Sequence, residues 1–278
     1  MCLVPLLVAL LGANPGPPAA LQDDPRSLRA LVLLENAALP PGEEVVAAFR
    51  ALAPGGETRG PIETGGDVST FWLTLGRGGR FLVELVPAPA SEREVEHALA
   101  FSASAALDPR PRLAPHHAHL VALLQDEPGR NRYWALVRFT YLLAAVARVS
   151  NATAVHWDAA GATHQAGWFV ERAAEADPDV MIAIWTGYQV LADGPERVSV
   201  VTRGMRHQLG TRELLVSAPR PELAEAVRKL LRYAAFAARR GTSTFVTDPA
   251  RSGVDLVRVH DQPSPLDPGQ PVWRINYP

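Results

Sequence analysis

The stretch Pro115–Gln125, which reads PHHAHLVALLQ, organises the rest of the chain. Its second half, Leu120–Leu124, is continuously apolar and is bounded by a proline on one side and by DEPG, residues 126–129, on the other. A short apolar run between turn residues is typical of a strand buried on both faces, although periodicity alone does not distinguish it from a buried piece of helix. The sequence therefore predicts a central strand here, with three of the chain's eight histidines at its start.

Composition places the chain among globular proteins that bury a large core. It has 278 residues, of which 47% are apolar and 20% charged, enough for one large domain or two ordinary ones. The net charge of -2 gives no electrostatic basis for binding nucleic acid or an acidic membrane surface. Cys2 is the single cysteine, which excludes a disulfide framework and a thiolate zinc site.

Residues 1–27 form a separate apolar and proline-rich segment. The run Cys2–Gly12 has the length of a signal-peptide core, and small residues and prolines follow it, but no Lys or Arg precedes Arg26. The run is also shorter than the roughly 20 residues that a membrane-spanning helix needs. We expect no membrane span and a cytoplasmic location, with disorder of this segment or secretion through an atypical N-terminal signal as alternatives.

The first part of the chain alternates strands and helices in a recognisable order. Apolar spacing and turn residues predict a strand, a helix, a hairpin, a second helix and a further strand, with a glycine-rich loop at residues 55–67. The ranges are Leu28–Leu34, Glu43–Leu52, Val68–Leu75, Arg80–Val86, Glu92–Ala106 and Pro115–Gln125. This is the order of a ferredoxin-like βαββαβ unit.

The second part repeats much of this order. It predicts Arg130–Val149, His164–Ala176 and Glu222–Arg240 as helices, and as strands Thr153–Asp158, Val180–Leu191, Arg197–Arg203, Arg212–Ser217, Val254–His260 and Val272–Tyr277. We expect an α+β fold with antiparallel or mixed sheets and helices on one face. It would consist of two ferredoxin-like halves, residues 28–127 and 128–278, that share a core.

Five segments resemble a known family. They are LVLLENAALP (31–40), VELVPAPASEREVEHA (83–98), HHAHLVALL (116–124), AVHWD (154–158) and VTRGMRHQLGTRELLV (201–216). Together they resemble the bacterial domain-of-unknown-function family DUF-4261 over roughly residues 28–277. The family's Thr-x-Gly-Met…Gly-x-x-Glu pattern is matched by Thr202, Gly204, Met205, Gly210 and Glu213, whereas Ala90 stands where its turn pattern has a last proline. The resemblance implies a bacterial protein and no particular activity.

The histidines suggest a metal site. In a strand over residues 115–125, His117 and His119 share one face and His116 lies on the other. A third ligand for zinc would come from His156 or Asp158, which are also two residues apart on a short predicted strand. The alternative interpretation is that these histidines form hydrogen bonds with backbone or carboxylates at a sheet edge.

The segment Gly204–Glu213, GMRHQLGTRE, has two interpretations. In the functional one, Gly204, His207 and Gly210 form a turn that approaches a ligand, and Glu213 is a carboxylate for acid–base catalysis. In the structural one, the glycines take positive φ in a bent hairpin, and Glu213 pairs with a neighbouring arginine, either Arg203 or Arg212.

No catalytic motif is present in the sequence. There is no Gly-x-Ser-x-Gly nucleophile elbow, and Gly76–Gly79 lacks the lysine of a phosphate loop. We therefore expect a non-enzymatic binding or protein-interaction module without a cofactor, whose candidate partner is another protein. The alternative is a metal-dependent hydrolase that uses zinc held by His117, His119 and His156.

Overall fold

The structure is a computed structural model, and it describes residues 27–53, 55, 62–76, 79–103, 113–125, 131–175, 177–240 and 258–276. The predictions for residues 1–26, for the end of the helix expected up to Ala106, and for the strand start at Val254 lie outside the described residues.

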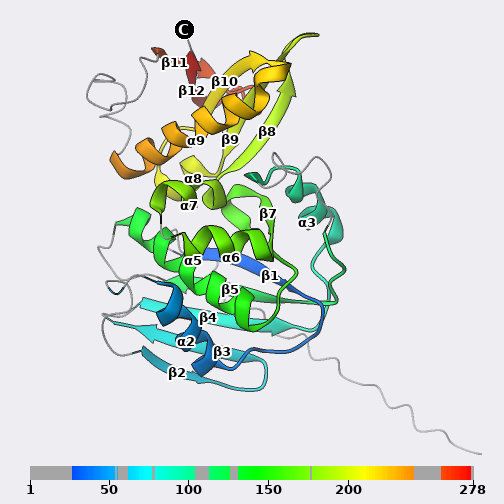
Figure 1. Ribbon diagram of the computed structural model, residues 1–278, viewed down its shortest axis with the longest axis vertical. Coiled ribbons are helices and arrows are strands. Elements are labelled where there is room, and N and C mark those ends of the chain that lie inside the picture. Colours follow the sequence, from blue (N-terminus) through cyan, green and yellow to red (C-terminus); the bar gives the residue numbers. More distant parts are fainter. Residues whose placement is uncertain are drawn as a thin grey trace, which may run out of the picture.

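A seven-stranded antiparallel sheet forms the larger layer, with strand order β2-β3-β4-β5-β1-β6-β7 (Figure 1). Its strands are β1 (Ser27–Leu34), β2 (Ile62–Gly66), β3 (Thr70–Leu75), β4 (Gly79–Val86), β5 (Ala118–Gln125), β6 (Ala154–Trp157) and β7 (Ala162–Gln165). β5 occupies the middle position, between β4 and β1, and this agrees with the central strand predicted from its apolar run.

Both faces of β5 are buried. Leu120 and Leu124 point into the main hydrophobic core, whereas Val121 and Leu123 point into a second cluster that includes Val95. The main core is covered by α2 (Gly42–Leu52) and α5 (Arg132–Val149), which pack on each other. The second face is covered by α3 (Glu92–Leu99), which carries Val95. The apolar run therefore reflects cover on two sides.

A five-stranded mixed sheet forms the other layer, with order β11-β12-β10-β9-β8 and one parallel pair, β10 with β12. Its strands are β8 (Gly187–Ala192), β9 (Arg197–Arg203), β10 (Leu214–Pro219), β11 (Arg258–Pro263) and β12 (Pro271–Asn276). The associated helices are α6 (Ala166–Ala174), α7 (Pro178–Trp185), α8 (Met205–Leu209) and α9 (Leu223–Arg240). Figure 1 shows α9 against this sheet, and α7 and α8 between it and the larger layer.

The α+β class and the antiparallel and mixed sheets agree with the prediction, but the order of two ferredoxin-like halves is not found. In a ferredoxin-like unit the first strand would lie between β4 and β5, and both helices would share a face. Here β5 separates β4 from β1, and α2 and α3 cover opposite faces. The placement of α2 and α3 follows from β5, because a strand that is apolar on both faces needs cover on both.

The sheets also cross the predicted division of the chain. β6 pairs with β1, so β6 and β7 extend the seven-stranded sheet beyond residue 127. One core cluster runs from Leu28 to Ile275 and joins both layers.

Two local predictions were wrong. Residues 62–66 form strand β2, although they are rich in Gly and Thr, because pairing with β3 satisfies the backbone groups on the side that faces β3. Val180–Trp185 belongs to helix α7, because an apolar run is compatible with a buried helix as well as with a strand.

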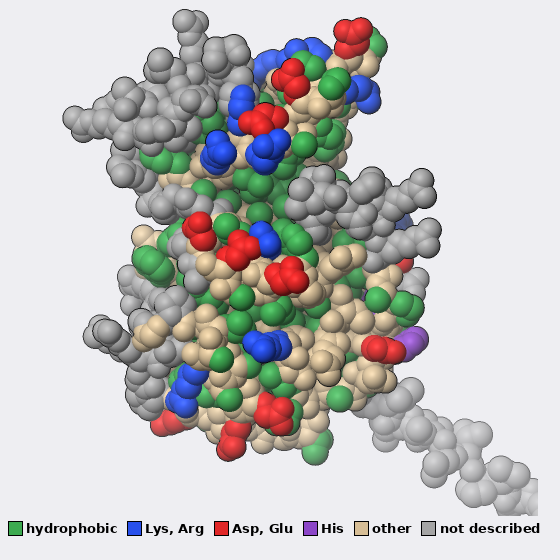
Figure 2. Space-filling model, viewed as in Figure 1, with side chains coloured by type: hydrophobic (Ala, Val, Ile, Leu, Met, Phe, Trp, Pro, Cys, Tyr) green, Lys and Arg blue, Asp and Glu red, His purple; other side chains and the backbone are tan. Residues whose placement is uncertain are grey.

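The surface carries both signs of charge. On the face drawn in Figure 2, basic and acidic side chains are interspersed, in keeping with the net charge of -2. Within the described ranges, no helix has both the length and the apolar composition needed to cross a membrane.

Candidate functional site

A pocket of about 360 Å³ lies where the two sheets meet, and we call it the inter-sheet pocket. It is formed by the end of α3, by β6 with the short 3-10 helix η1 (Asp158–Ala160) that follows it, and by the last residue of β9. Its lining residues are His97, Ala98, Phe101, His156, Asp158, Gly161 and Arg203. Two of the sequence-predicted residues, His156 and Asp158, therefore come together in one pocket.

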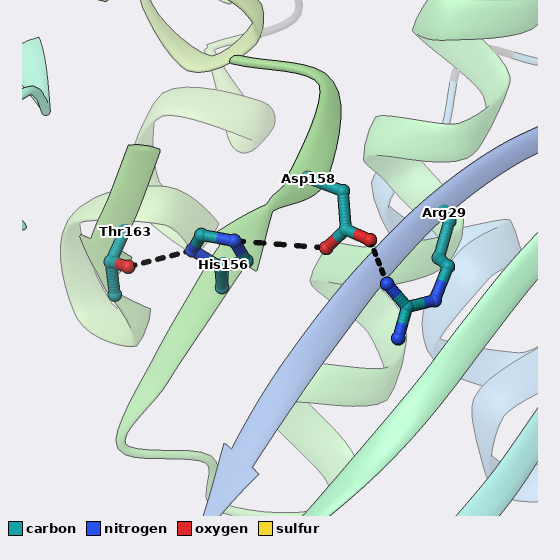
Figure 3. Close-up of polar contacts among 4 residues, drawn as sticks. All are labelled: Arg29, His156, Asp158 and Thr163. Atoms are coloured by element: carbon teal, nitrogen blue, oxygen red, sulfur yellow. Dashed lines mark hydrogen bonds and ion pairs between the residues drawn. The ribbon is translucent and has the colours of Figure 1, made fainter. Parts of the chain in front are cut away.

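A chain of polar contacts runs through the wall of this pocket (Figure 3). The hydroxyl of Thr163 lies 2.9 Å from Nδ1 of His156, and Nε2 of the same ring lies 3.7 Å from Oδ1 of Asp158. The other oxygen of Asp158, Oδ2, accepts a hydrogen bond from the guanidinium of Arg29 on β1. Both ring nitrogens of the buried His156 are thus directed at protein groups, Nδ1 at hydrogen-bond distance and Nε2 beyond it.

The carboxylate of Asp158 keeps one oxygen without a full hydrogen bond. Oδ1 is buried, and it has no hydrogen-bond partner in the part of the chain that the structure describes. The 3.7 Å separation from His156 is longer than the 2.7–3.2 Å of a normal N–H···O bond. Arg29 therefore balances the charge of Asp158, but the hydrogen-bonding capacity of Oδ1 is left unused by the described residues.

Arg203 enters the pocket from the smaller sheet. Its guanidinium carbon lies 4.8 Å from the centre of the Phe101 ring, within the range of a cation–π contact. Among the described residues, no hydrogen bond or ion pair of this guanidinium is found. Gly161 allows the close approach: it has φ 55°, and a Cβ at this position would lie 3.4 Å from Nη2 of Arg203.

A second contact between the sheets borders the same η1 turn and is fully bonded. Gln208 of α8 accepts a hydrogen bond from Nε1 of Trp157 at 2.6 Å and donates one to the carbonyl of Trp185 at 2.5 Å. Its own carbonyl accepts from Nε of Arg132 at 3.1 Å. We call these four residues the Gln208 junction. It ties β6, α7 and α5 to α8.

The Gly204–Glu213 segment has a structural role at this junction. Gly204 and Gly210 take positive φ on either side of α8, as the structural interpretation requires. Glu213 accepts hydrogen bonds from Oγ1 of Thr202 at 2.7 Å and from the backbone N–H of Arg206 at 3.0 Å.

The expected arginine partner of Glu213 is not found, because its oxygens are used by Thr202 and by the start of α8. Arg212 instead pairs with Asp261. Burial raises the pKa of Glu213, and the hydrogen bonds it accepts oppose that rise. His207 is exposed on α8, outside the inter-sheet pocket.

The predicted zinc ligands do not converge. His117 is exposed just before β5, and Nδ1 of His119 donates to the carbonyl of Ala88 at 2.8 Å. Burial lowers the pKa of His119. β1 lies between β5 and β6, so His119 and His156 are separated by two strand spacings, about 10 Å. Across the described ranges, no group of three or more His, Cys, Asp or Glu is placed to hold a metal ion.

A buried Ser–His pair lies behind the pocket and was not anticipated from the sequence. Nε2 of His164 donates to the carbonyl of Ile184 at 3.0 Å, so Nδ1 accepts from the hydroxyl of Ser102 at 2.7 Å. Burial lowers the pKa of His164 to about 4, so the ring is neutral near pH 7. Ser102 is 2% exposed, which leaves its hydroxyl covered against a substrate.

A further hollow of about 360 Å³ lies on the seven-stranded sheet, over β3, β4 and β5. Aromatic and aliphatic side chains dominate it, with Trp72 42% exposed beside Leu82 and Leu123, and Arg80 is the one charged residue among the described residues that line it. A protein partner could use such a surface, but it brings together no set of polar groups that would define a small ligand.

Sequence reasoning missed the pocket residues Phe101 and Gly161, and it considered Arg203 only as an ion-pair partner of Glu213. An Asp-Ala-Ala-Gly turn signal was present at residues 158–161 and could have drawn attention to Gly161. Arg203 gave no signal of its own, because its role depends on which carboxylates lie near it.

No family model, no curated protein and no solved structure matches this chain. The resemblance to DUF-4261 therefore stays a prediction.

Proposed function

We propose that this chain is a non-enzymatic binding protein, and that its ligand occupies the inter-sheet pocket. The observation that carries the proposal is the presence, in one pocket, of two charged side chains whose bonding capacity the described residues leave unused: Arg203 and Asp158. Oδ1 of Asp158 is buried, and buried polar atoms are normally hydrogen-bonded in folded proteins, so a bound molecule is favoured at this site. The pocket volume of about 360 Å³ suits a small ligand.

Binding is favoured over hydrolysis by the state of the candidate catalytic groups. A general base needs a ring nitrogen or carboxylate within reach of substrate, whereas both nitrogens of His156 are directed at Thr163 and Asp158. Ser102 is buried, and Glu213 accepts hydrogen bonds from the start of α8. A protein partner, as in the interaction-module form of the prediction, would use the hollow around Trp72 and stays a prediction.

A pocket-filling variant tests the proposal. Gly161→Asn places a side chain in the pocket, and Asn tolerates the left-handed backbone of Gly161 better than most residues do. Gly194→Asn is the matched control, because Gly194 also has positive φ, lies in the β8–β9 turn and has open space around it. Thermal unfolding of all three proteins would be followed with a panel of amino acids, sugars, nucleotides, organic acids and organic phosphates.

The expected result is that at least one compound raises the melting temperature of the wild type and of Gly194→Asn but not of Gly161→Asn. A ligand at a hundredfold excess over its Kd stabilises by about 2.7 kcal/mol, which is readily measured. A compound that stabilises Gly161→Asn equally well would place the ligand elsewhere. If the whole panel gives no shift with the wild type, the proposal is abandoned.

A further inference from the structure

We infer that the ligand of the inter-sheet pocket is a small anion with an apolar body, a carboxylate or a phosphate monoester, and that Arg203 binds its charged group. This inference rests on the proposed function, because it names the ligand class of the same pocket.

The charges that line the pocket support an anion. Asp158 is the one carboxylate among the described residues that line the pocket, and Arg29 already pairs with it from outside the pocket. Arg203 and Asp158 form no ion pair with each other, and the guanidinium has no other acid partner among the described residues. The arginine charge is therefore the one left for a ligand to neutralise, and a charge in a partly enclosed site interacts more strongly than one in bulk water.

The geometry of Arg203 suits a carboxylate or a phosphate. The guanidinium carbon lies 4.8 Å from the centre of the Phe101 ring, so the aromatic contact restrains the position of the group. A cation–π contact occupies no oxygen or nitrogen acceptor, so the N–H donors of the group stay available to a ligand. These donors form a fork that matches two oxygens of a carboxylate or phosphate. Gly161 keeps the space beside Nη2 open, since a larger residue there would lie against it.

The other residues that line the pocket favour a ligand with an apolar body. Ala98, in the last turn of α3, and Phe101, just after the helix ends, have buried side chains, and the His97 ring packs edge-on against Phe101 at 4.9 Å. A ligand whose anion reaches Arg203 would rest its uncharged part against this wall. Simple aromatic acids match both features.

Four probes and three variants test the inference by isothermal titration calorimetry on the full chain. The probes are benzoate and phenyl phosphate, with benzamide and phenol as their neutral counterparts. Arg203→Gln removes the charge and keeps much of the stem, and Arg203→Lys keeps the charge without the planar fork. Arg197→Gln is the matched control, because Arg197 lies on the same strand but outside the pocket and donates to the carbonyl of Ser217.

The expected result is that benzoate or phenyl phosphate binds the wild type and Arg197→Gln, at least tenfold more weakly to Arg203→Gln, and with intermediate affinity to Arg203→Lys. The tighter of the two anions identifies the charged group as a carboxylate or a phosphate. Equal binding of an anion to Arg203→Gln would overturn the inference, and so would the failure of both anions to bind.

The two proposals fail in different ways. If the neutral probes bind as tightly as the anions and Gly161→Asn blocks them, the pocket is a ligand site but its ligand is not an anion. If neither these probes nor the wider panel binds the wild type, both proposals fall.

Discussion

Two contacts between the sheets border the same η1 turn, and they differ in how completely their polar groups are bonded. At the Gln208 junction, the side-chain amide and the backbone carbonyl of Gln208 bond to Trp157, Trp185 and Arg132. At the inter-sheet pocket, Oδ1 of Asp158 has no hydrogen-bond partner, and Arg203 has a ring contact in place of an anion, within the residues that the structure describes.

The difference separates structure from candidate function. A fully bonded junction fixes how the layers pack, and removing one member leaves buried groups without partners. An incompletely bonded pocket contributes little to packing, and in the proposed function its unused bonding capacity serves a ligand. The segment Thr202–Glu213 belongs mostly to the first kind, and Arg203 within it belongs to the second.

Gln208→Leu is expected to have the largest effect on stability. Leucine has a similar size but leaves Nε1 of Trp157 and the carbonyl of Trp185 buried without partners, so the loss should be about 3 kcal/mol. Urea unfolding measures it, with Gln270→Leu as the control at an exposed glutamine, expected to change stability by less than about 0.5 kcal/mol. Equal stability of the two variants would mean that the junction does not hold the layers together.

Gly204→Ala should cost less, about 2 kcal/mol. Gly204 has φ 96°, and an added Cβ would lie 2.8 Å from Cα of Ala160 in η1. Gly210→Ala is the matched comparison. Gly210 has φ 66° and no atom within 4 Å of an added Cβ, so this substitution should lose only the free energy of backbone strain, about 1 kcal/mol. A cost for Gly204→Ala no larger than that for Gly210→Ala would show that the approach to η1 is not close in solution.

The parts of the fold that depend on local pattern could be predicted from the sequence. The apolar run in β5, the hairpin of β3 and β4 and the amphipathic helix α9 were all recognisable in this way. The pairing of β6 with β1 could not be, because it joins segments more than a hundred residues apart through backbone bonds that any side chains permit.

The site was predictable only in part, for a related reason. His156 and Asp158 were singled out as zinc ligands by residue type and spacing, and the structure places them in a pocket where each is held by another residue. Arg203 was considered only as a partner of Glu213, because its lack of an acidic partner among the described residues becomes visible only when every nearby carboxylate has been placed.

His164 extends the comparison to pH. Burial lowers the pKa of His164 to about 4, whereas an unfolded histidine titrates near 6.5. The unfolded chain therefore binds the proton first. The stability is full above about pH 6.5 and falls as the pH drops toward 4, by about 1 kcal/mol between pH 6 and pH 5.

Urea unfolding at pH 6 and pH 5 measures this loss, with His164→Gln and the exposed His97→Gln compared with the wild type. His164→Gln should lose less stability than the wild type over this interval, and His97→Gln should lose as much. If the loss in His164→Gln equals that of the wild type, another group carries the pH dependence.

Arg203→Gln should have the smallest effect on folding, below about 0.5 kcal/mol, because it removes one cation–π contact of a partly exposed side chain and no ion pair known among the described residues. The same substitution is expected to weaken anion binding at least tenfold. This combination, a stable variant that no longer binds, is what a pocket kept for a ligand requires. If Arg203→Gln instead unfolds as readily in urea as Gln208→Leu, Arg203 is a structural member of the contact between the sheets, and the distinction between the two contacts disappears.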